Sequence, residues 1–297
     1  MDNKKSSLLS RRQALKSLAA LTAGTLIKPS SLFATTEAVR SKTRFVVLGD
    51  FGTGGSDEAA IAQKMAETHR QAPLDFILGA GDNIYPNGAG HLFARNFEQP
   101  FAELLRQDVK FYTVLGNHDV EAGRHDQMHY PLFNMNGANY YTMGRGNGLA
   151  DFFMLDSTDF DNQQTTWLET QLAQSKALWK IAVFHHPIYS SGKKHGSDVR
   201  LRQRIEPLLK KHNVQVVFSG HDHVYERLKP QDGIQYFVSG GAGKVRHGDI
   251  RADSTISAAS YDDDNHFMLI EVDEKEIAFK AISKVGAVVD SGVIRQS

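Results

Sequence analysis

The sequence predicts an α/β fold with mixed sheets, and two observations carry this prediction. Short apolar runs rich in Val, Ile and Phe alternate along the chain with longer segments of helical periodicity. Because such alternation requires crossover connections, the strands and helices should form stacked layers. Further strand-like runs then follow one another near the end of the chain, which adds antiparallel strands and makes the sheets mixed.

Nine apolar runs of four to six residues are predicted as strands, because turn residues bound them and most are rich in β-branched or aromatic residues. They lie at 44–48, 75–78, 111–115, 150–155, 180–184, 214–218, 235–238, 267–272 and 277–281. The last two flank a short turn and should pair as an antiparallel hairpin.

Four segments are predicted as helices, at 56–69, 91–106, 166–176 and 198–212. The third begins with Thr166 and Glu169, whose spacing of three residues is typical of a capping box. Two long stretches rich in Gly and Asn, at 116–148 and 239–261, are predicted as loops. Loops of this length in a compact domain usually serve function, so we expect them to border a site.

Residues 1–34 have the pattern of a secretory signal: a basic start, a short apolar stretch at 14–27 and then small residues. The segment 10–16, with Arg11 and Arg12, resembles the twin-arginine export consensus of bacteria. We therefore expect the twin-arginine translocase as a partner during export and a periplasmic or secreted protein. An ordinary basic signal with a chance arginine pair would also give export. The apolar stretch is too short to span a bilayer, so no stable membrane anchor is expected.

Composition limits the remaining chain to one domain and to certain partners. The sequence has 297 residues, 41% of them hydrophobic, and shows no repeat or linker, so residues 35–297 should form a single domain. Without residues 1–34, which hold six basic side chains and one acidic side chain, 28 Lys and Arg face 33 Asp and Glu, a formal charge of −5. Such a mildly acidic domain gives no electrostatic footprint for nucleic acid, whose binding needs a basic face, so no nucleic-acid partner is expected. Attraction for an anionic substrate would have to be local.

Polar side chains follow five of the predicted strands. They are Asp50, Asp82, Tyr85, Asn117, His185, His221 and His223. Any one of them could be an ordinary turn or loop residue, but open α/β sheets place their chemistry at strand ends of this kind. The chain has no cysteine, so metal ligands must be oxygen or imidazole nitrogen. Together the seven residues predict a metal centre and an enzyme.

Two spacings support this interpretation. In extended backbone, residues two apart point to the same side, so His221 and His223 can face one centre. Asp82 and Tyr85 lie three residues apart after a Gly-Asp turn, close enough for a carboxylate and a phenol to reach the same ion.

The ordered motifs GDFG, GDNIY, GNHD, FHHP and GHDH resemble the five-block signature of the calcineurin-like metallophosphoesterases. Tyr85, placed three residues after Asp82, is the mark of one branch, the purple acid phosphatases, and the short chain is similar to the small, tartrate-resistant type. The resemblance runs from about residue 44 to residue 244 and fills all seven ligand positions. It implies a four-layer α/β/β/α sandwich, with 35–297 as the catalytic domain.

The resemblance also implies a set of ligands. Fe³⁺ would be held by Asp50, Asp82, Tyr85 and His223. A divalent ion (Fe²⁺, Zn²⁺ or Mn²⁺) would be held by Asp82, Asn117, His185 and His221. His185 is chosen over His186 because the family's ligand sits two residues before the proline.

The activity implied is that of an exported acid phosphatase, which hydrolyses small phosphomonoesters with a metal-bound hydroxide as nucleophile. His118 and His195 match family positions proposed for phosphate contact or for protonation of the leaving group. Two alternatives stay open: a metallophosphodiesterase or nucleotidase of the same superfamily, and a non-catalytic binding protein on the same fold.

Overall fold

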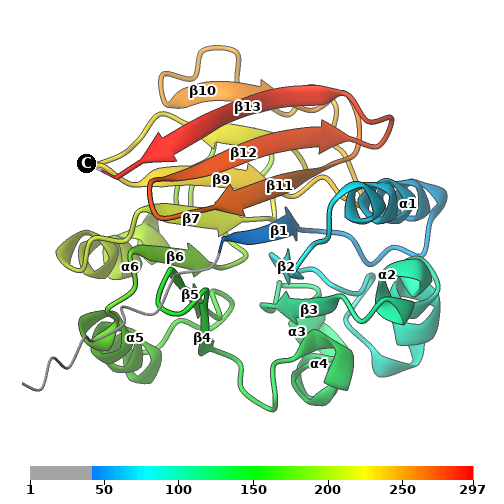
Figure 1. Ribbon diagram of the computed structural model, residues 1–297, viewed down its shortest axis with the longest axis horizontal. Coiled ribbons are helices and arrows are strands. Elements are labelled where there is room, and N and C mark those ends of the chain that lie inside the picture. The colour runs from blue at the N-terminus through cyan, green and yellow to red at the C-terminus, as the bar shows by residue number, and fades with distance from the viewer. Residues whose placement is uncertain (1–41, 297) are drawn as a thin grey trace, which may run out of the picture. The chain divides into compact units, whose positions relative to one another are not determined.

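The structure is a computed structural model that describes residues 42–296 (Figure 1). The export segment predicted at 1–34 lies outside the described residues. Within residues 42–296, no helix combines the length and the apolar character needed to cross a membrane.

Two sheets form the centre of the fold. The first has the order β13-β12-β11-β1-β2-β3 and the second the order β10-β8-β9-β7-β6-β5-β4. Each contains parallel and antiparallel pairs, so the prediction of mixed sheets is confirmed. The strands of the first sheet are β1 (Thr43–Leu48), β2 (Phe76–Gly79), β3 (Lys110–Thr113), β11 (His266–Val272), β12 (Glu276–Ser283) and β13 (Val288–Arg295). Those of the second are β4 (Tyr141–Arg145), β5 (Ala150–Met154), β6 (Trp179–Val183), β7 (Val216–Ser219), β8 (Tyr225–Leu228), β9 (Gln235–Ser239) and β10 (Ser257–Tyr261).

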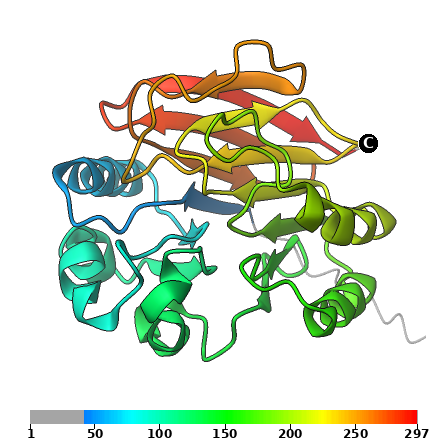
Figure 2. The same ribbon diagram turned by 180° about the vertical axis from the view of Figure 1, so that it is seen from behind.

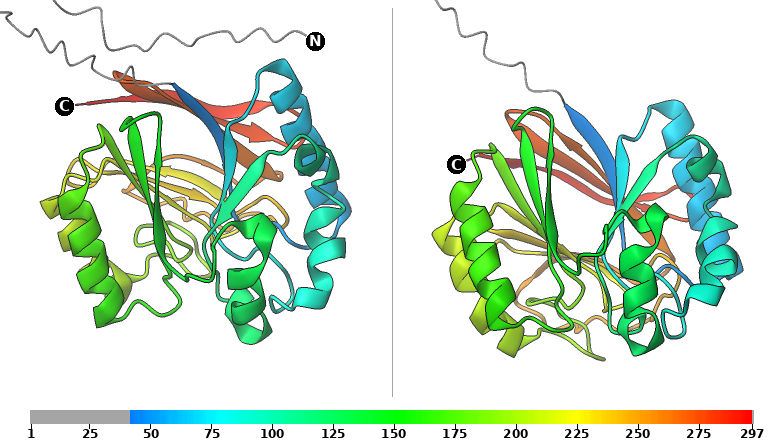
Figure 3. Two further views of the ribbon diagram at one scale, coloured as in Figure 1. Left: turned by 60° about the horizontal axis from the view of Figure 1, so that its bottom comes forward. Right: turned by 90° about the horizontal axis from the view of Figure 1, so that it is seen from below.

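Three buried clusters separate four layers, α/β/β/α. One cluster fills the space between the sheets, the second lies under α1 (Ser56–Gln71) and α2 (Ala102–Arg106), and the third lies under α5 (Asn162–Gln174) and α6 (Val199–Lys211). Strand β1 shows how the sequence builds this arrangement. Its alternate residues Phe45 and Val47 face the space between the sheets, whereas Val46 and Leu48 face the α1 side. Figure 2 and Figure 3 show the two pairs of helices on opposite sides of the paired sheets.

Two helix predictions are corrected by the structure. The helix predicted at 91–106 is a 3₁₀ turn (Gly90–Leu92), a π-helical segment (Ala94–Glu98) and α2. Pro100 lies between the last two and cannot donate a helical hydrogen bond. The capping box at Thr166 was wrong: α5 starts earlier, and the Asp161 side chain caps it by accepting a bond from Gln164 N.

The two predicted loops contain regular structure. Residues 116–148 include α3 (Asp119–Ala122), α4 (Arg124–His129), a 3₁₀ turn (Pro131–Phe133) and β4, and residues 239–261 include β10. Four strands were missed: β4, β8, β10 and β13. Three of them (β4, β10 and β13) are edge strands of their sheets. Many of their side chains are exposed to solvent, so their sequences contain no long apolar run.

Glu58 in the first turn of α1 is buried, and its Oε2 accepts bonds from Thr53 N and Gly54 N at 2.9 and 2.6 Å. Burial raises the pKa of Glu58 to about 8, against 4.5 in its ordinary state. The folded protein therefore keeps a proton that the unfolded chain loses. Stability from this group is present below pH 4.5 and is lost as the pH rises towards 8.

We therefore expect Glu58→Gln to flatten the fall in unfolding free energy between pH 5 and pH 8. The wild-type fall from this group is at most about 1.4 kcal/mol per pH unit. Urea unfolding of the metal-free protein at several pH values measures it. Asp57→Asn, which removes an exposed carboxylate from the same turn, should keep the wild-type slope. Equal slopes for Glu58→Gln and the wild type would contradict the expectation.

Candidate metal centre

The seven residues predicted as ligands come together from both sheets. Asp50 follows β1, Asp82 and Tyr85 follow β2, and Asn117 follows β3. His185 follows β6, and His221 and His223 follow β7 in the second sheet. The side chains form two groups of contacts.

The first group surrounds the Tyr85 hydroxyl. This oxygen lies 2.9 Å from Asp82 Oδ2, 3.1 Å from Asp50 Oδ1 and 3.2 Å from His223 Nε2. A phenol has one proton, so it cannot donate fully to both carboxylates at once. Burial and the two carboxylates raise the pKa of Tyr85 far above its ordinary value. A cation among these atoms would satisfy all of them, and the donor set fits one.

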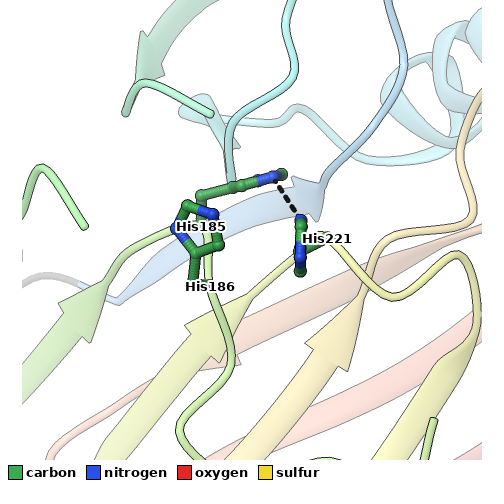
Figure 4. Close-up of side chains that lie close together, drawn as sticks. All are labelled: His185, His186 and His221. Atoms are coloured by element: carbon green, nitrogen blue, oxygen red, sulfur yellow. Dashed lines mark hydrogen bonds between the residues drawn. The ribbon is translucent and has the colours of Figure 1, made fainter. Parts of the chain in front are cut away.

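The second group surrounds His185 Nε2. This nitrogen lies 3.1 Å from Asn117 Oδ1, 3.2 Å from His221 Nδ1 and 3.5 Å from Asp82 Oδ1. The other ring nitrogen, Nδ1, donates to Ala80 O at 2.9 Å, which leaves a lone pair on Nε2 in the neutral ring. Figure 4 shows the contact between His185 and His221.

Asp82 belongs to both groups. Its Oδ2 contacts Tyr85 in the first group, and its Oδ1 faces His185 in the second. Asp50, Asp82 and His185 also form one of the sets of side chains close enough to hold a common ion. This arrangement can accommodate two adjacent cations that share the Asp82 carboxylate.

The backbone is strained where the site is built. Asp50, Asp82 and His221 have φ values of 58°, 51° and 71°, which residues other than glycine seldom adopt. Neighbouring glycines make room for the carboxylates. A Cβ on Gly116 would lie 2.2 Å from Asp82 Oδ1, and a Cβ on Gly220 would lie 2.5 Å from Asp50 Oδ2. Glycine at these two positions is therefore needed for close approach.

Electrostatics favour cation binding. Although burial opposes its ionisation, contacts with His223 and His185 hold the pKa of Asp50 below its ordinary value. Burial and the surrounding imidazoles lower the pKa of His221, so this ring is neutral and keeps a lone pair for a metal.

The two predicted catalytic histidines lie beside these groups. His118 Nδ1 donates to Pro86 O at 2.6 Å, its Nε2 lies 4.0 Å from Asp82 Oδ2, and its ring packs against Tyr85 at 4.7 Å. The ring of His195 packs against that of His221 at 4.2 Å. Burial, with help from nearby cations, lowers the pKa of His195.

His186 was predicted as a structural neighbour of His185 rather than a ligand. Its backbone N donates to Ser157 Oγ at 3.0 Å, and its Nδ1 lies 2.9 Å from the same oxygen. Burial lowers the pKa of His186 to about 4. One ring nitrogen from each of His185, His186 and His221 lies within 4.8 Å of the others, a spacing that could hold a metal ion.

Asp119 was quoted in a motif but given no role by the sequence. It is fully buried and accepts five hydrogen bonds, from Gly116 N, from the backbone N and side-chain Nδ2 of Asn83, from Ile84 N and from Gln127 Nε2. It thereby ties the segment before Asn117 to the segment after Asp82. The GNHD spacing was the signal that could have identified it.

Lys244 was missed because its position depends on tertiary structure. Gly243 N donates to Asp50 O and Arg246 N donates to His223 O, so the backbone around residue 244 is fixed at two points of the site. The Lys244 ammonium lies 3.4 Å from the centroid of the Tyr85 ring. Burial lowers the pKa of Lys244, against the raising effect of the two carboxylates. No spacing in the sequence indicates this contact.

Comparisons with known proteins found a family and several relatives of this chain. Residues 43–225 match the family model described as calcineurin-like phosphoesterase. Purple acid phosphatase 17 of Arabidopsis thaliana is 30% identical over 239 residues, covering 69% of this chain and 70% of the plant protein. Tartrate-resistant acid phosphatase type 5 of Rattus norvegicus is 28% identical over 299 residues, covering 86% of this chain and 91% of the rat protein.

A solved structure described as GAP50, the anchor in the inner membrane complex of Plasmodium, superposes with a TM-score of 0.76 at 23% identity. The match covers 86% of this chain and 89% of that chain. At this level of identity the likeness shows the fold alone.

Proposed function

The chain belongs to the calcineurin-like phosphoesterases and, within them, to the purple acid phosphatases, and from this we propose that it is an acid phosphatase that hydrolyses small phosphomonoesters at a dinuclear metal centre. The observation that carries the proposal is the placement of Asp82 between the Tyr85 group and the His185 group.

We assign the residues of the first group, Asp50, Asp82, Tyr85 and His223, to Fe³⁺. We assign Asp82, Asn117, His185 and His221 to a divalent ion, Fe²⁺, Zn²⁺ or Mn²⁺. These assignments are the ones that the family resemblance implies. The donor chemistry supports them, since phenolate and carboxylate oxygen suit a hard ion, and imidazole suits several divalent ions. Such a pair of ions, when bound, supplies Lewis-acid polarisation of the phosphate and acidifies a water molecule.

The chain's own residues then orient the ester and move protons. Because Nδ1 of His118 is held by Pro86 O, its Nε2 is the atom that can give a proton to the departing oxygen. His195 packs against His221 in the second group, and we propose it as the other residue that contacts the phosphate or protonates the leaving group. The Lys244 ammonium over the Tyr85 ring adds positive charge where an anionic phosphoryl group would bind.

We further propose export through the twin-arginine translocase to the periplasm or the medium, supported by the Arg11-Arg12 pair. Fractionation of cells expressing a variant with lysine at both positions tests it, because retention of the variant in the cytoplasm is expected. Equal export of both forms would favour an ordinary signal.

The colour of the purified protein tests the proposed metal centre. We expect a visible charge-transfer band from the Tyr85 phenolate to ferric iron, and Tyr85→Phe should abolish it because no other tyrosine contacts Asp50 or Asp82 among residues 42–296. Absorption spectra of both proteins at equal iron content measure this. A colourless wild type that is active and fully metallated would rule out the iron–phenolate assignment.

Substrate assays separate the remaining alternatives. Faster turnover of p-nitrophenyl phosphate than of its bis-ester supports a monoesterase, and the reverse order supports a diesterase. The likeness to an anchor protein raises the non-catalytic alternative. Absence of turnover in fully metallated protein would support that alternative.

A further inference from the structure

A cavity of about 480 Å³ adjoins the second group of the metal centre. Its lining includes the imidazoles of His186, His195 and His221 together with Lys194, Val199 and Arg200. We propose that this cavity receives the leaving group of the phosphate ester and favours leaving groups that carry a negative charge of their own. This inference rests on the proposed function and deepens it by naming a substrate class.

One residue of the proposed metal centre, His221, also lines the cavity. His221, which lines it, contacts His185 Nε2 through its own Nδ1 at 3.2 Å. The rings of His186 and His195 pack on His221 with centroid distances of 4.5 and 4.2 Å. A phosphoryl group bound at the centre therefore has this cavity beside it to hold the rest of the ester.

Two cations on the cavity wall have no anionic partner. Among the described residues, neither the Lys194 nor the Arg200 side chain makes a hydrogen bond or an ion pair. The adjacent Lys193 differs, because its Nζ donates to Gly248 O at 2.6 Å. Asp198 supplies the cavity's carboxylate, and its Oδ1 accepts a bond from Leu201 N at the start of α6. The wall therefore presents unpaired positive charge.

The backbone that carries these cations is held in place. Lys194 N donates to Asp249 Oδ1 at 3.0 Å, and Gly196 N donates to Asp222 Oδ2 at 3.1 Å. Arg200 lies in the first turn of α6, whose start is tied down by the bond from Asp198 N to Pro187 O at 2.8 Å. Both side chains therefore extend from fixed positions at the rim of one cavity.

The net charge of the whole domain is negative, so the local positive charge of Lys194 and Arg200 has to attract an anionic substrate. Residues 35–297 have a formal charge of −5, so the long-range field repels anions and attraction has to come from such a patch. The cavity is of the size that holds a small metabolite. The substrate class is therefore a small organic phosphate with a second phosphate or a carboxylate on its leaving group.

A matched pair of synthetic esters tests the proposal. 4-Carboxyphenyl phosphate has an anionic leaving group, and 4-carbamoylphenyl phosphate has a neutral one of nearly the same shape. The measured quantity is kcat/KM for the carboxylate ester divided by kcat/KM for the carbamoyl ester, with the metallated full-length protein. The difference in intrinsic reactivity between the two esters is the same for every variant, so it cancels when variants are compared. We expect the ratio to fall about threefold in Lys194→Gln and in Arg200→Gln and about tenfold in the double variant.

Lys193→Gln is the control, because it removes a neighbouring charge that does not line the cavity, and it should keep the wild-type ratio. The wild-type ratio should also decrease as salt is added, since the two cations are exposed. An unchanged ratio in the double variant, or an equal fall in the control, would overturn the inference while leaving the phosphatase intact. Failure of the wild type to hydrolyse either ester would instead overturn the proposed function, and this inference with it.

Discussion

Replacing Asp82 with asparagine is expected to lower kcat/KM for p-nitrophenyl phosphate by at least about 10³-fold, or about 4 kcal/mol of transition-state stabilisation. Asparagine keeps the volume and one oxygen but loses the charge that faces both groups of ligands. In the wild type, the Asp82 carboxylate lies 2.9 Å from the Tyr85 hydroxyl and 3.5 Å from His185 Nε2. The substitution therefore removes a charged ligand that both cation sites share. Steady-state kinetics with metal supplied in excess measures the loss.

The same substitution should not destabilise the metal-free protein. The charge of Asp82 helps to raise the pKa values of Asp119 and Tyr85, which means that the buried carboxylates repel one another without metal. The unfolding free energy of metal-free Asp82→Asn should therefore equal or exceed that of the wild type. Asp126→Asn, which changes an exposed carboxylate on α4, is the control and should keep full activity. Activity within tenfold of the wild type in Asp82→Asn would contradict a shared ligand.

Replacing Asp119 with alanine is expected to destabilise the fold by about 3 to 5 kcal/mol, because it leaves buried donors without an acceptor. Five hydrogen bonds end on this carboxylate, from Gly116, Asn83, Ile84 and Gln127. Their loss frees the loops that carry Asn117 and Asp82, so metal affinity should fall as well. Chemical denaturation of the metal-free protein measures the stability, and metal titration measures the affinity.

The control for this effect is Asp126→Ala, which removes an exposed carboxylate seven residues along the chain. It should change the unfolding free energy by less than about 0.5 kcal/mol. A loss below about 1 kcal/mol in Asp119→Ala would mean that the network contributes little to the fold.

The layered fold was predictable because its central strands are short and strongly apolar. All nine predicted strands exist, and β1 alternates between two cores as its sequence suggests. The continuous helix predicted at 91–106 was wrong because Pro100, which the prediction did not take into account, has no amide hydrogen and interrupts the helix. Strand β13 was missed because an edge strand half exposed to solvent has no buried run to reveal it.

The metal ligands of the candidate site were predictable because they follow strands whose ends lie close together in the fold. The five motifs brought all seven predicted ligands to one place, with the shared position of Asp82 among them. Lys244 and the cations of the adjoining cavity could not be predicted, because their approach to Tyr85 and His221 depends on how separate loops fold over one another. Asp119 is intermediate: it lay within a recognised motif, but only the structure shows the bonds that it accepts.

Anomalous diffraction from crystals of the active protein, collected across the iron edge, tests the central claim most directly. The account predicts two metal peaks about 3.5 to 4 Å apart on either side of the Asp82 carboxylate, with Tyr85 bound to the iron. A single peak, or two peaks that do not both contact Asp82, in crystals of fully active protein would contradict it.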